Sequence, residues 1–266
     1  MDGRVLVVVP TYQERANIAS VLHRVLGAVP AAHVLVVDDG SPDGTADVAS
    51  DVGATRGHID VLRRDGKRGL GDAYRAGFAW GLARGYDVFV EIDADLSHDP
   101  GALPSLLRAV AEGADLVIGS RYVPGGCTPG WPRRRRWLSR AGNTYARLLL
   151  GLRVRDATSG YRAYTRRALA AIDAPASRAS GYGFQIELTA RVARARGRIH
   201  EVPIEFCDRA FGESKMSARI ACEACWLVTW WALRDRVLRR TRAPESLGGT
   251  PRTSASAPTP AVRDAA

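Results

Sequence analysis

The sequence predicts an α/β protein with a mainly parallel sheet and helices on both of its faces. Three observations support this prediction. The first 121 residues alternate short apolar runs with longer segments of helical periodicity, and 46% of the 266 residues are hydrophobic, enough for a large core. Residues 5–9 are apolar throughout, as in a parallel strand buried on both faces. Polar clusters follow four of the apolar runs, after Val9, Val37, Ile92 and Gly119. Because ligands of parallel sheets bind beyond the carboxyl ends of the strands, these clusters are expected to converge on one crevice.

The expected elements follow in order along the chain. Strands are predicted at residues 5–9, 33–37, 59–63, 87–92 and 115–119, and helices at 17–28, 45–52, 71–84 and 101–112. Beyond Tyr122 the alternation ends in a Gly/Pro-rich loop, VPGGCTPGWPRRRR. Helices are then predicted at 137–150 and 183–196, a strand at 199–206 and a long amphipathic helix at 217–240. Residues 1–240 are therefore expected to form one domain, with a loop at about 122–142.

The C-terminal region has two parts of different character. The predicted helix at 217–240 contains an uncharged run, ACWLVTWWAL, of ten residues. A bilayer span needs about 20, so this helix is expected either to lie at a membrane interface or to pack on the core. Residues 241–266 are rich in Pro, Ser, Thr and Ala without periodicity, which predicts a disordered tail.

The charge distribution indicates an anionic partner. The net charge is +10, and Trp131–Arg155 contains eight arginines and no acidic residue. Such a segment is either a solvated face or a surface that meets phosphate, in a nucleotide, a nucleic acid or an anionic lipid. The start of the chain, MDGRVLVVVP, lacks the features of a signal peptide, and four scattered cysteines form no disulfide framework. A cytoplasmic location is expected.

Carboxylates at the end of the fourth strand are the first candidate site. In FVEIDADLSHDP, Asp93 and Asp95 would share one face of an extended chain. At a separation of about 6 Å and an effective dielectric near 20, they would repel by about 3 kcal/mol. They are either a solvated strand end or ligands of a divalent cation, Mg²⁺ or Mn²⁺. The turns PTYQERANI and VVDDGSPDGT end neighbouring strands, and DGKRGLGDAYRAGF fits neither the Walker nor the Rossmann spacing.

Eight motifs in order resemble the polyprenol-phosphate (dolichol-phosphate) mannose synthases, which are inverting, metal-dependent glycosyltransferases of the GT-A fold. The motifs span about residues 4–218: PTYQE, VVDDGSPDGT, GKRGLGDAYRAGF, DADLSHDP, GSRYVPGG, DATSGYRAY, GYGFQIE and EVPIEFCDRAFGESKM. The resemblance implies a GT-A-type nucleotide-sugar-binding fold and transfer of mannose from GDP-mannose to a polyprenyl phosphate.

The resemblance also implies the roles of individual residues. The nucleoside of GDP-mannose would be bound by Pro10, Tyr12, Glu14, Val37 and Asp39. The Mg²⁺ or Mn²⁺ that bridges the diphosphate would be bound by Asp93 and Asp95, with the backbone of Ala94 nearby, and the diphosphate itself would be gripped by Arg209 and Lys215. The acceptor phosphate would be received by Arg121, Arg133, Arg134, Arg135 and Arg136. Asp95 and Arg121 are the expected catalytic residues. A phosphate monoester is already ionised, so no strong general base is required, and His98 is expected to be a structural neighbour of the metal loop.

The acceptor implies contact with a membrane. Trp131, Trp137 and the arginines between them resemble an interfacial set, although a solvated loop with two packed tryptophans is the alternative. The protein is expected to be peripheral at the cytoplasmic face, with a membrane-anchoring protein partner as a further possibility. The same reaction with another donor such as UDP-glucose stays open. A basic nucleic-acid-binding protein is disfavoured because no known nucleic-acid motif is present, so no nucleic-acid partner is expected.

Overall fold

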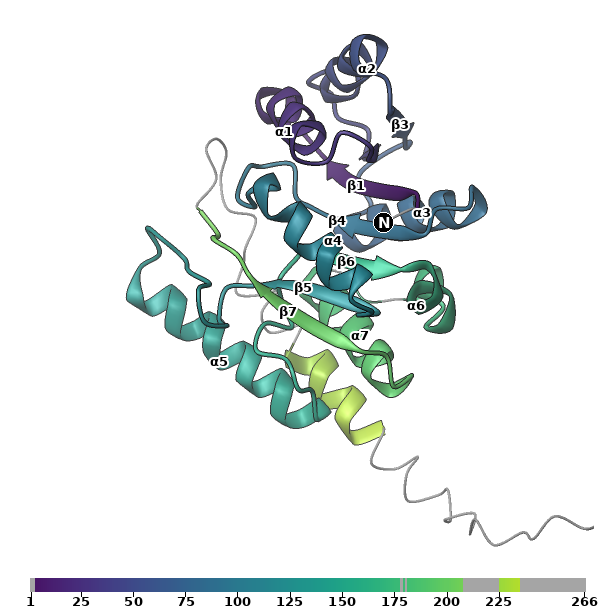
Figure 1. The fold of residues 1–266 in the computed structure, drawn as a ribbon. Helices are drawn as coiled ribbons and strands as arrows, with labels where there is room; N and C mark the ends of the chain where they lie inside the picture. The colour runs from purple at the N-terminus through teal and green to yellow at the C-terminus, as the bar shows by residue number, and fades with distance from the viewer. Residues whose placement is uncertain (1–2, 178, 180, 208–224, 235–266) are drawn as a thin grey trace, which may run out of the picture.

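The computed structural model describes residues 3–177, 179, 181–207 and 225–234, and it is built around one seven-stranded sheet (Figure 1). The strand order is β3-β2-β1-β4-β6-β5-β7. Six strands run parallel, and β6 is antiparallel to both of its neighbours, β4 and β5. The predicted α/β class with a mainly parallel sheet is confirmed.

The elements have the following bounds. The strands are β1 Val5–Thr11, β2 His33–Asp38, β3 Ile59–Arg63, β4 Val88–Glu91, β5 Leu116–Ser120, β6 Arg162–Thr165 and β7 Ile199–Pro203. The α-helices are α1 Arg15–Ala28, α2 Thr45–Arg56, α3 Leu70–Ala83, α4 Leu103–Ala111, α5 Arg133–Leu150, α6 Arg166–Ala171 and α7 Gly181–Arg194. Two short 3₁₀ helices, η1 and η2, span Pro100–Ala102 and Ala174–Ala176.

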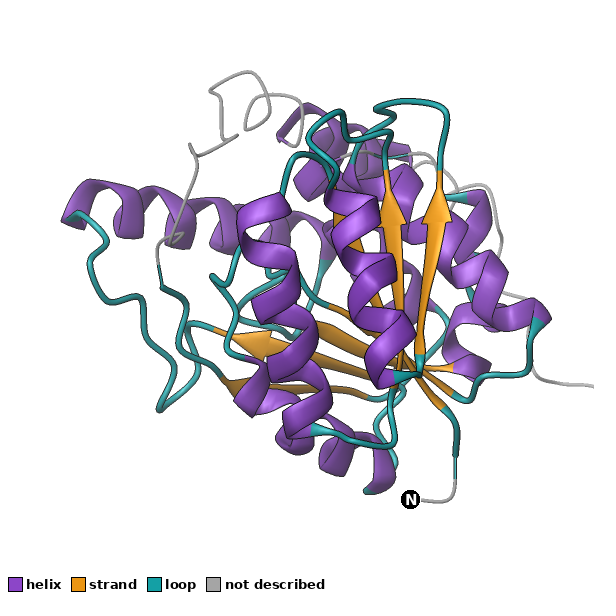
Figure 2. Cartoon of the chain, turned by 90° about the horizontal axis from the view of Figure 1, so that it is seen from above, coloured by secondary structure: helices purple, strands orange, loops and turns teal. Residues whose placement is uncertain are grey.

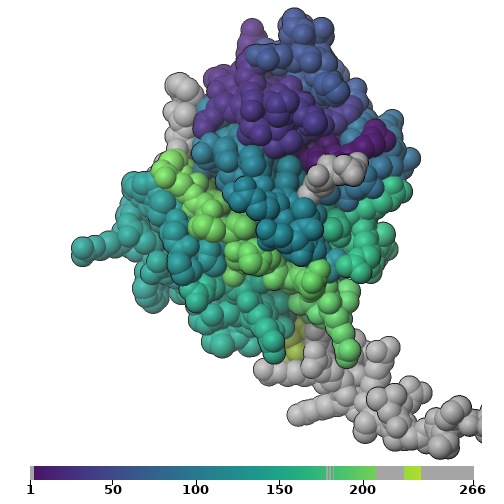
Figure 3. Space-filling view, in the orientation of Figure 1, coloured from purple at the N-terminus to yellow at the C-terminus, as the bar shows by residue number. Residues whose placement is uncertain are grey.

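Helices cover both faces of the sheet, so the core has two layers, one on each face (Figure 2). One layer packs α1, α2 and α4 on the sheet, and the other packs α3, α6 and α7. Glycine allows α3 to approach β1 closely: a Cβ at Gly77 would lie 2.5 Å from Val8, and one at Gly81 would lie 2.5 Å from Leu6. Figure 3 shows the purple and blue N-terminal elements packed directly on the later teal and green ones.

Helix α6 and three other elements differ from the sequence prediction, in which α6 (Arg166–Ala171) was absent. Strand β6 was not predicted, because it is four residues long and begins with an arginine, Arg162. Helix α5 begins at Arg133 rather than at Trp137, so the four consecutive arginines form its first turn and are not part of a loop. Strand β7 ends at Pro203, and Cys127 and His98 then form isolated bridges with residues 205 and 206.

The C-terminal helix is only partly described. Residues 225–234 are helical, and Tyr145 of α5 contacts Thr229 through a hydrogen bond of 2.7 Å between their hydroxyls. The remainder of the helix predicted at 217–240, and the tail predicted at 241–266, lie outside the described residues. Within the described residues, every helix is too short or too polar to cross a bilayer.

Candidate active site

The turns after β1 and β2 lie side by side at the carboxyl edge of the sheet. Pro10 pairs in register with Val37, and Thr11 pairs with Asp38. The hydroxyl of Thr11 donates a hydrogen bond of 2.9 Å to the Asp38 carboxylate, so the two strand ends are joined by side chains as well as by the ladder. The structure therefore brings together Pro10 and Val37, as expected for one nucleoside-binding edge.

The rest of the first turn carries an aromatic ring and a carboxylate. The Lys67 ammonium lies over the Tyr12 ring, 4.2 Å from its centroid, so the basic turn before α3 faces the turn after β1. Glu14 is held in place by two hydrogen bonds. Its backbone N–H donates to the Thr45 hydroxyl at 3.0 Å, and its side chain accepts from Asn17 at 2.9 Å. Tyr12 and Glu14 thus lie at the same edge as Pro10.

Asp39 fastens the basic turn to the end of β2. Its buried carboxylate accepts a hydrogen bond of 2.6 Å from Arg64 and bonds of 3.0 Å from the backbone N–H groups of Arg68 and Gly69. These contacts give the GKRGLG segment a fixed position beside the strand ends. A role of Asp39 in nucleoside binding stays a prediction.

The predicted metal ligands lie in a turn that follows β4. The strand ends at Glu91 and the chain turns at residues 94–95, so the extended geometry expected for Asp93 and Asp95 is wrong. Asp95 is buried, and its Oδ1 accepts hydrogen bonds from the backbone N–H and the hydroxyl of Ser97. The Asp93 side chain keeps 28% of its surface exposed, and its Oδ2 lies 3.6 Å from Nδ1 of His98.

These residues fit a divalent cation that arrives with its nucleotide. Both are hard carboxylate ligands, and the Ser97 contacts fix the orientation of Asp95. The described residues contain no cluster of three or more His, Cys, Asp or Glu able to hold a metal. Mg²⁺ is commonly bound by one or two carboxylates together with substrate phosphates and water, so the donor diphosphate would supply further ligands.

His98 is a neutral, buried neighbour of the metal loop. It packs against Tyr161 and Phe206, with ring centroids 5.2 and 5.0 Å away. Burial lowers the pKa of His98 to about 4, with the charge of Asp95 opposing the shift. The imidazole is therefore uncharged at neutral pH, in agreement with the structural role expected for it.

A buried acid that the sequence did not single out lies two residues before the predicted metal ligand Asp93. Glu91 is fully buried at the end of β4 and pairs in register with Arg162 of β6. Among the described residues, the side chains of Arg162 and Gln185 act on its carboxyl group. Burial raises the pKa of Glu91 to about 8, against the opposing charge of Arg162. At neutral pH this side chain is mainly an uncharged carboxylic acid.

Arg121 lies at the end of β5 and is held by a buried carboxylate. Its Nε and Nη2 each donate a bond of 2.7 Å to Asp156, and Nη2 also donates to Thr158 at 2.8 Å. Its guanidinium carbon lies 5.5 Å from the ring centroids of both Trp131 and Phe206. Burial would raise the pKa of Asp156, but the charge and hydrogen bonds of Arg121 hold it below its usual value. The side chain of the predicted acceptor arginine is thus held by hydrogen bonds to Asp156 and Thr158 and surrounded by aromatic rings.

The arginine run occupies the first turn of α5, beside this setting. Arg133 and Arg134 are exposed, Arg135 lies over the Trp131 ring at 3.9 Å, and Arg136 donates to the Trp131 carbonyl at 3.0 Å. The positive end of the helix dipole adds to their charge. Trp131 therefore connects Arg121 and the run, and the structure brings all five predicted acceptor arginines to one region.

Trp131 is not an interfacial anchor, because it is buried with 5% of its surface exposed. The exposed apolar side chains lie instead along α5 and the helix at 225–234. Trp137 and Leu148 are 70% and 71% exposed, and Trp226 and Trp230 are 64% and 53% exposed. The contact between Tyr145 and Thr229 places the two helices side by side, and Figure 1 shows this pair at the lower edge of the molecule. We call this set the two-helix face.

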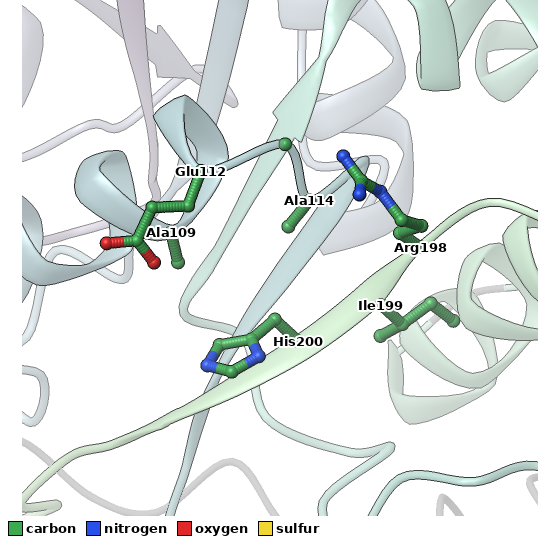
Figure 4. A pocket seen from close by; sticks show the side chains of 7 residues that line it. Ala109, Glu112, Ala114, Arg198, Ile199 and His200 are labelled. Atoms are coloured by element: carbon green, nitrogen blue, oxygen red, sulfur yellow. The ribbon is translucent and has the colours of Figure 1, made fainter.

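A pocket of about 410 Å³ lies at the opposite edge of the sheet from the predicted site, and Figure 4 shows the side chains that line it. It is lined by the end of α4 and the start of β7, including Glu112, Arg198 and His200. These are the amino ends of β5 and β7, whereas the predicted site lies at the carboxyl ends.

Two predicted diphosphate ligands, Arg209 and Lys215, fall outside the described residues.

Asp156 is the main site residue that sequence reasoning missed. One indication was available, because Asp156 is the first acid after Asp115, at the end of a long arginine-rich stretch. Phe206, which contacts both His98 and Trp131, carries no such indication, because its partners lie 108 and 75 positions away in the chain.

Comparison with known proteins finds relatives along most of the chain. Residues 6–173 match the family model described as Glycosyl transferase family 2. The chain is 54% identical over 233 residues to the undecaprenyl-phosphate mannosyltransferase of Micrococcus luteus, which covers 88% of this chain and 96% of that protein. It is 52% identical over 237 residues to the polyprenol monophosphomannose synthase of Mycolicibacterium smegmatis, which covers 89% of each.

The fold also resembles a solved structure. The glucosyl-3-phosphoglycerate synthase of Mycobacterium tuberculosis, in complex with Mn²⁺, UDP-glucose and phosphoglyceric acid, superposes with a TM-score of 0.66. The identity is 23%, and the match covers 87% of this chain and 80% of that one. At this identity the likeness concerns the fold alone, and it confirms the GT-A-type architecture expected from the sequence.

Proposed function

The chain belongs to glycosyl transferase family 2 and, within it, to the polyprenol-phosphate mannose synthases, and on that basis we propose that it transfers mannose from GDP-mannose to a polyprenyl phosphate. The observation that carries the proposal is the arrangement of two opposite charges around one segment. The carboxylate of Asp93 and the guanidinium of Arg121 both border residues 156–160. A leaving diphosphate and an attacking phosphate need such a pair of neighbouring sites.

The donor would lie along the edge formed by the turns after β1, β2 and β4. Pro10, Tyr12, Glu14, Val37 and Asp39 line the nucleoside end of that edge, and Lys67 adds a positive charge above Tyr12. Asp93 and Asp95 would hold Mg²⁺ or Mn²⁺, which supplies positive charge to the leaving diphosphate. Arg209 and Lys215 are proposed to bind the same diphosphate.

The acceptor phosphate would be oriented by Arg121 and the first turn of α5. An oxygen of the phosphate monoester attacks the anomeric carbon of mannose, the bond from that carbon to the GDP oxygen breaks, and the anomeric configuration inverts. The attacking oxygen is already ionised near neutral pH, so the protein need not remove a proton from it. The contribution of this chain is alignment and electrostatic stabilisation by fixed charges.

The two-helix face is proposed to contact the membrane that contains the acceptor. Tryptophans are favoured at membrane interfaces, and exposed arginines are attracted to anionic lipid. The two-helix face carries three exposed tryptophans, Trp137, Trp226 and Trp230, and α5 also carries the exposed arginines Arg133, Arg134, Arg140 and Arg147. Peripheral attachment follows from this proposal, and we propose that it is at the cytoplasmic face. Anchoring by a membrane protein is the alternative, in which the chain alone would not bind vesicles.

The deciding experiment is transfer of radiolabelled sugar into a polyprenyl-phosphate extract. GDP-mannose is compared with UDP-glucose and UDP-N-acetylglucosamine, each with Mg²⁺, Mn²⁺ or EDTA. We expect labelled lipid from GDP-mannose only, and its loss in EDTA. Label from a UDP-sugar alone would overturn the donor assignment and retain the reaction class, and activity that persists in EDTA would overturn the metal assignment.

A further inference from the structure

Residues 156–160 (sequence DATSG) lie between the predicted acceptor arginine and the predicted metal carboxylate. At one end Asp156 bonds to Arg121. At the other end a Cβ on Gly160 would lie 3.5 Å from Asp93 Oδ2 and 3.8 Å from the His98 ring. This segment therefore bonds to Arg121 at one end and lies beside the Asp93 carboxylate at the other.

Asp156 makes three contacts with Arg121 and is fully buried. Its carboxylate accepts from Nε and Nη2 at 2.7 Å each and from the Arg121 backbone N–H at 3.0 Å. Thr158 accepts a third side-chain bond from Arg121 and also bonds to Asn143 of α5, at 3.0 and 3.2 Å. The same segment thus ties the guanidinium to the helix that carries the arginine run.

Two further side chains hold the segment in place through hydrogen bonds to its backbone. Glu201 of β7 accepts the backbone N–H groups of Arg155 and Asp156, at 2.8 and 2.9 Å. The fully buried Arg162 donates bonds of 2.6 Å to the carbonyls of Ala157 and Ser159. Because these bonds are to backbone groups, they restrain the path of the segment itself.

We propose that Asp156 is a positioning residue that fixes the orientation of Arg121 relative to the metal loop, with the 156–160 segment setting the separation between acceptor and donor sites. The inference rests on the proposed function and adds to it a residue that touches neither substrate. Asp156 holds the Nε–Nη2 edge of a planar guanidinium in a two-bond geometry, which sets the direction in which the remaining edge points.

The orientation of Arg121 matters because the attack requires an in-line approach. Displacement of a reacting group by about 1 Å can lower a rate by about 10²-fold. Asparagine at position 156 keeps the shape of the side chain but replaces one accepting oxygen with an amide that donates. The two-bond contact with Arg121 would be lost, while the nucleotide edge on β1 and β2 would be unchanged.

The test is a double-mutant cycle of Asp156→Asn, Arg121→Lys and the double variant, measured as mannose transfer with each substrate varied. For Asp156→Asn we expect kcat/KM for polyprenyl phosphate to fall by about 10²-fold. Binding of GDP with Mn²⁺, measured by calorimetry, should change by less than about threefold. If Asp156 acts through Arg121, the double variant should lose little more than Arg121→Lys alone.

Asp115→Asn is the matched control. Asp115 is also buried, accepts a backbone N–H from Arg198 at 2.8 Å and bonds to Arg167 at 2.5 Å, but it lies at the amino end of β5. We expect it to lower the melting temperature without raising the acceptor KM. If Asp156→Asn fails to fold, Glu201→Gln tests the same point, and it should raise the acceptor KM with GDP binding unchanged.

The outcomes separate this inference from the proposed function. Additive losses in the double variant, or an equal loss of GDP binding, would show that Asp156 has no specific connection with Arg121. An unaltered acceptor KM in Glu201→Gln would do the same if Asp156→Asn cannot be prepared. A wild-type chain that uses a different sugar donor would overturn the donor assignment only, and the cycle run with that donor would still decide the role of Asp156.

Discussion

Removing one exposed tryptophan from the two-helix face should weaken membrane binding by an amount that the structure allows us to calculate. Trp137 lies on α5 with 70% of its surface exposed. A tryptophan side chain can bury up to about 250 Å², so about 170 Å² is available for contact with lipid. At about 25 cal/mol per Å², full insertion would contribute about 4 kcal/mol. At an interface the ring is about half inserted, which gives about 2 kcal/mol, or about 30-fold in partitioning.

The assay is co-sedimentation with vesicles of phosphatidylcholine and phosphatidylglycerol. Trp137→Ala should lower the partition coefficient about 30-fold. Binding of GDP with Mn²⁺ should be unaffected, because Trp137 lies on α5, whereas the described residues of the proposed donor edge lie in the turns after β1, β2 and β4. Trp80→Ala serves as the control, since Trp80 lies on α3 and packs on Tyr86 and Arg84 at the other end of the sheet.

Three results would refute this account. Equal partitioning of Trp137→Ala and the wild type would show that the two-helix face does not enter the interface. A wild-type chain that does not co-sediment with vesicles at all would favour anchoring by a membrane protein partner. A loss of binding in Trp80→Ala equal to that in Trp137→Ala would indicate a general effect of lost tryptophan on folding.

Three further predictions concern the reaction centre. Asp95→Asn keeps an oxygen that can accept from Ser97 but removes a negative charge. Half-maximal activity should therefore need at least tenfold more Mn²⁺, measured by titrating the transfer reaction with metal. An unchanged Mn²⁺ requirement would contradict the metal assignment. Replacement of Arg133 and Arg134 by serine should raise the acceptor KM several-fold and leave the GDP-mannose KM nearly constant, and equal changes in both would argue against an acceptor role. Glu91 has a pKa raised from 4.5 to about 8, so its contribution to stability is fully present below pH 4.5 and is lost as the pH rises through 8. Glu91→Gln should remove this pH dependence of the free energy of unfolding, which amounts to about 5 kcal/mol in total. The free energy of unfolding is measured by guanidinium denaturation in EDTA between pH 5 and pH 9. If it changes with pH equally in the mutant and the wild type, Glu91 does not titrate in this way.

The strands at the start of the chain could be predicted because their pattern is local. Residues 5–9 and 33–37 are almost entirely apolar, and the bounds of β3 were predicted to the residue. The polar groups after these strands were expected to converge because parallel strands place their carboxyl ends at one edge. The family resemblance then assigned them to donor and metal sites.

The arrangement around Arg121 could not be predicted in the same way, because it depends on contacts between distant segments. Trp131 is buried by Phe206, and Arg121 is paired with Asp156, 35 positions away. Helix α5 was expected to begin too late, since four charged residues hide the apolar periodicity of its first turn. Pro132 directly before that turn was the available indication, because proline is favoured at helix starts.

The positive charge of the chain is divided between two populations of arginine with different physical roles. Arg121 and Arg162 are buried, and their side chains make hydrogen bonds of 2.6 to 3.3 Å with fixed partners, so salt screens them little and they set geometry. Arg133 and Arg134 are exposed at the start of α5, where they attract anions over about a Debye length, about 8 Å at physiological salt. Capture of a phosphate at the membrane surface should therefore weaken as the ionic strength rises. The alignment of the captured phosphate depends on Arg121, which is held by the buried Asp156, and it should not weaken with ionic strength. We therefore propose that the two populations serve two separate steps, the exposed arginines attracting the acceptor and the buried Arg121 orienting it for attack.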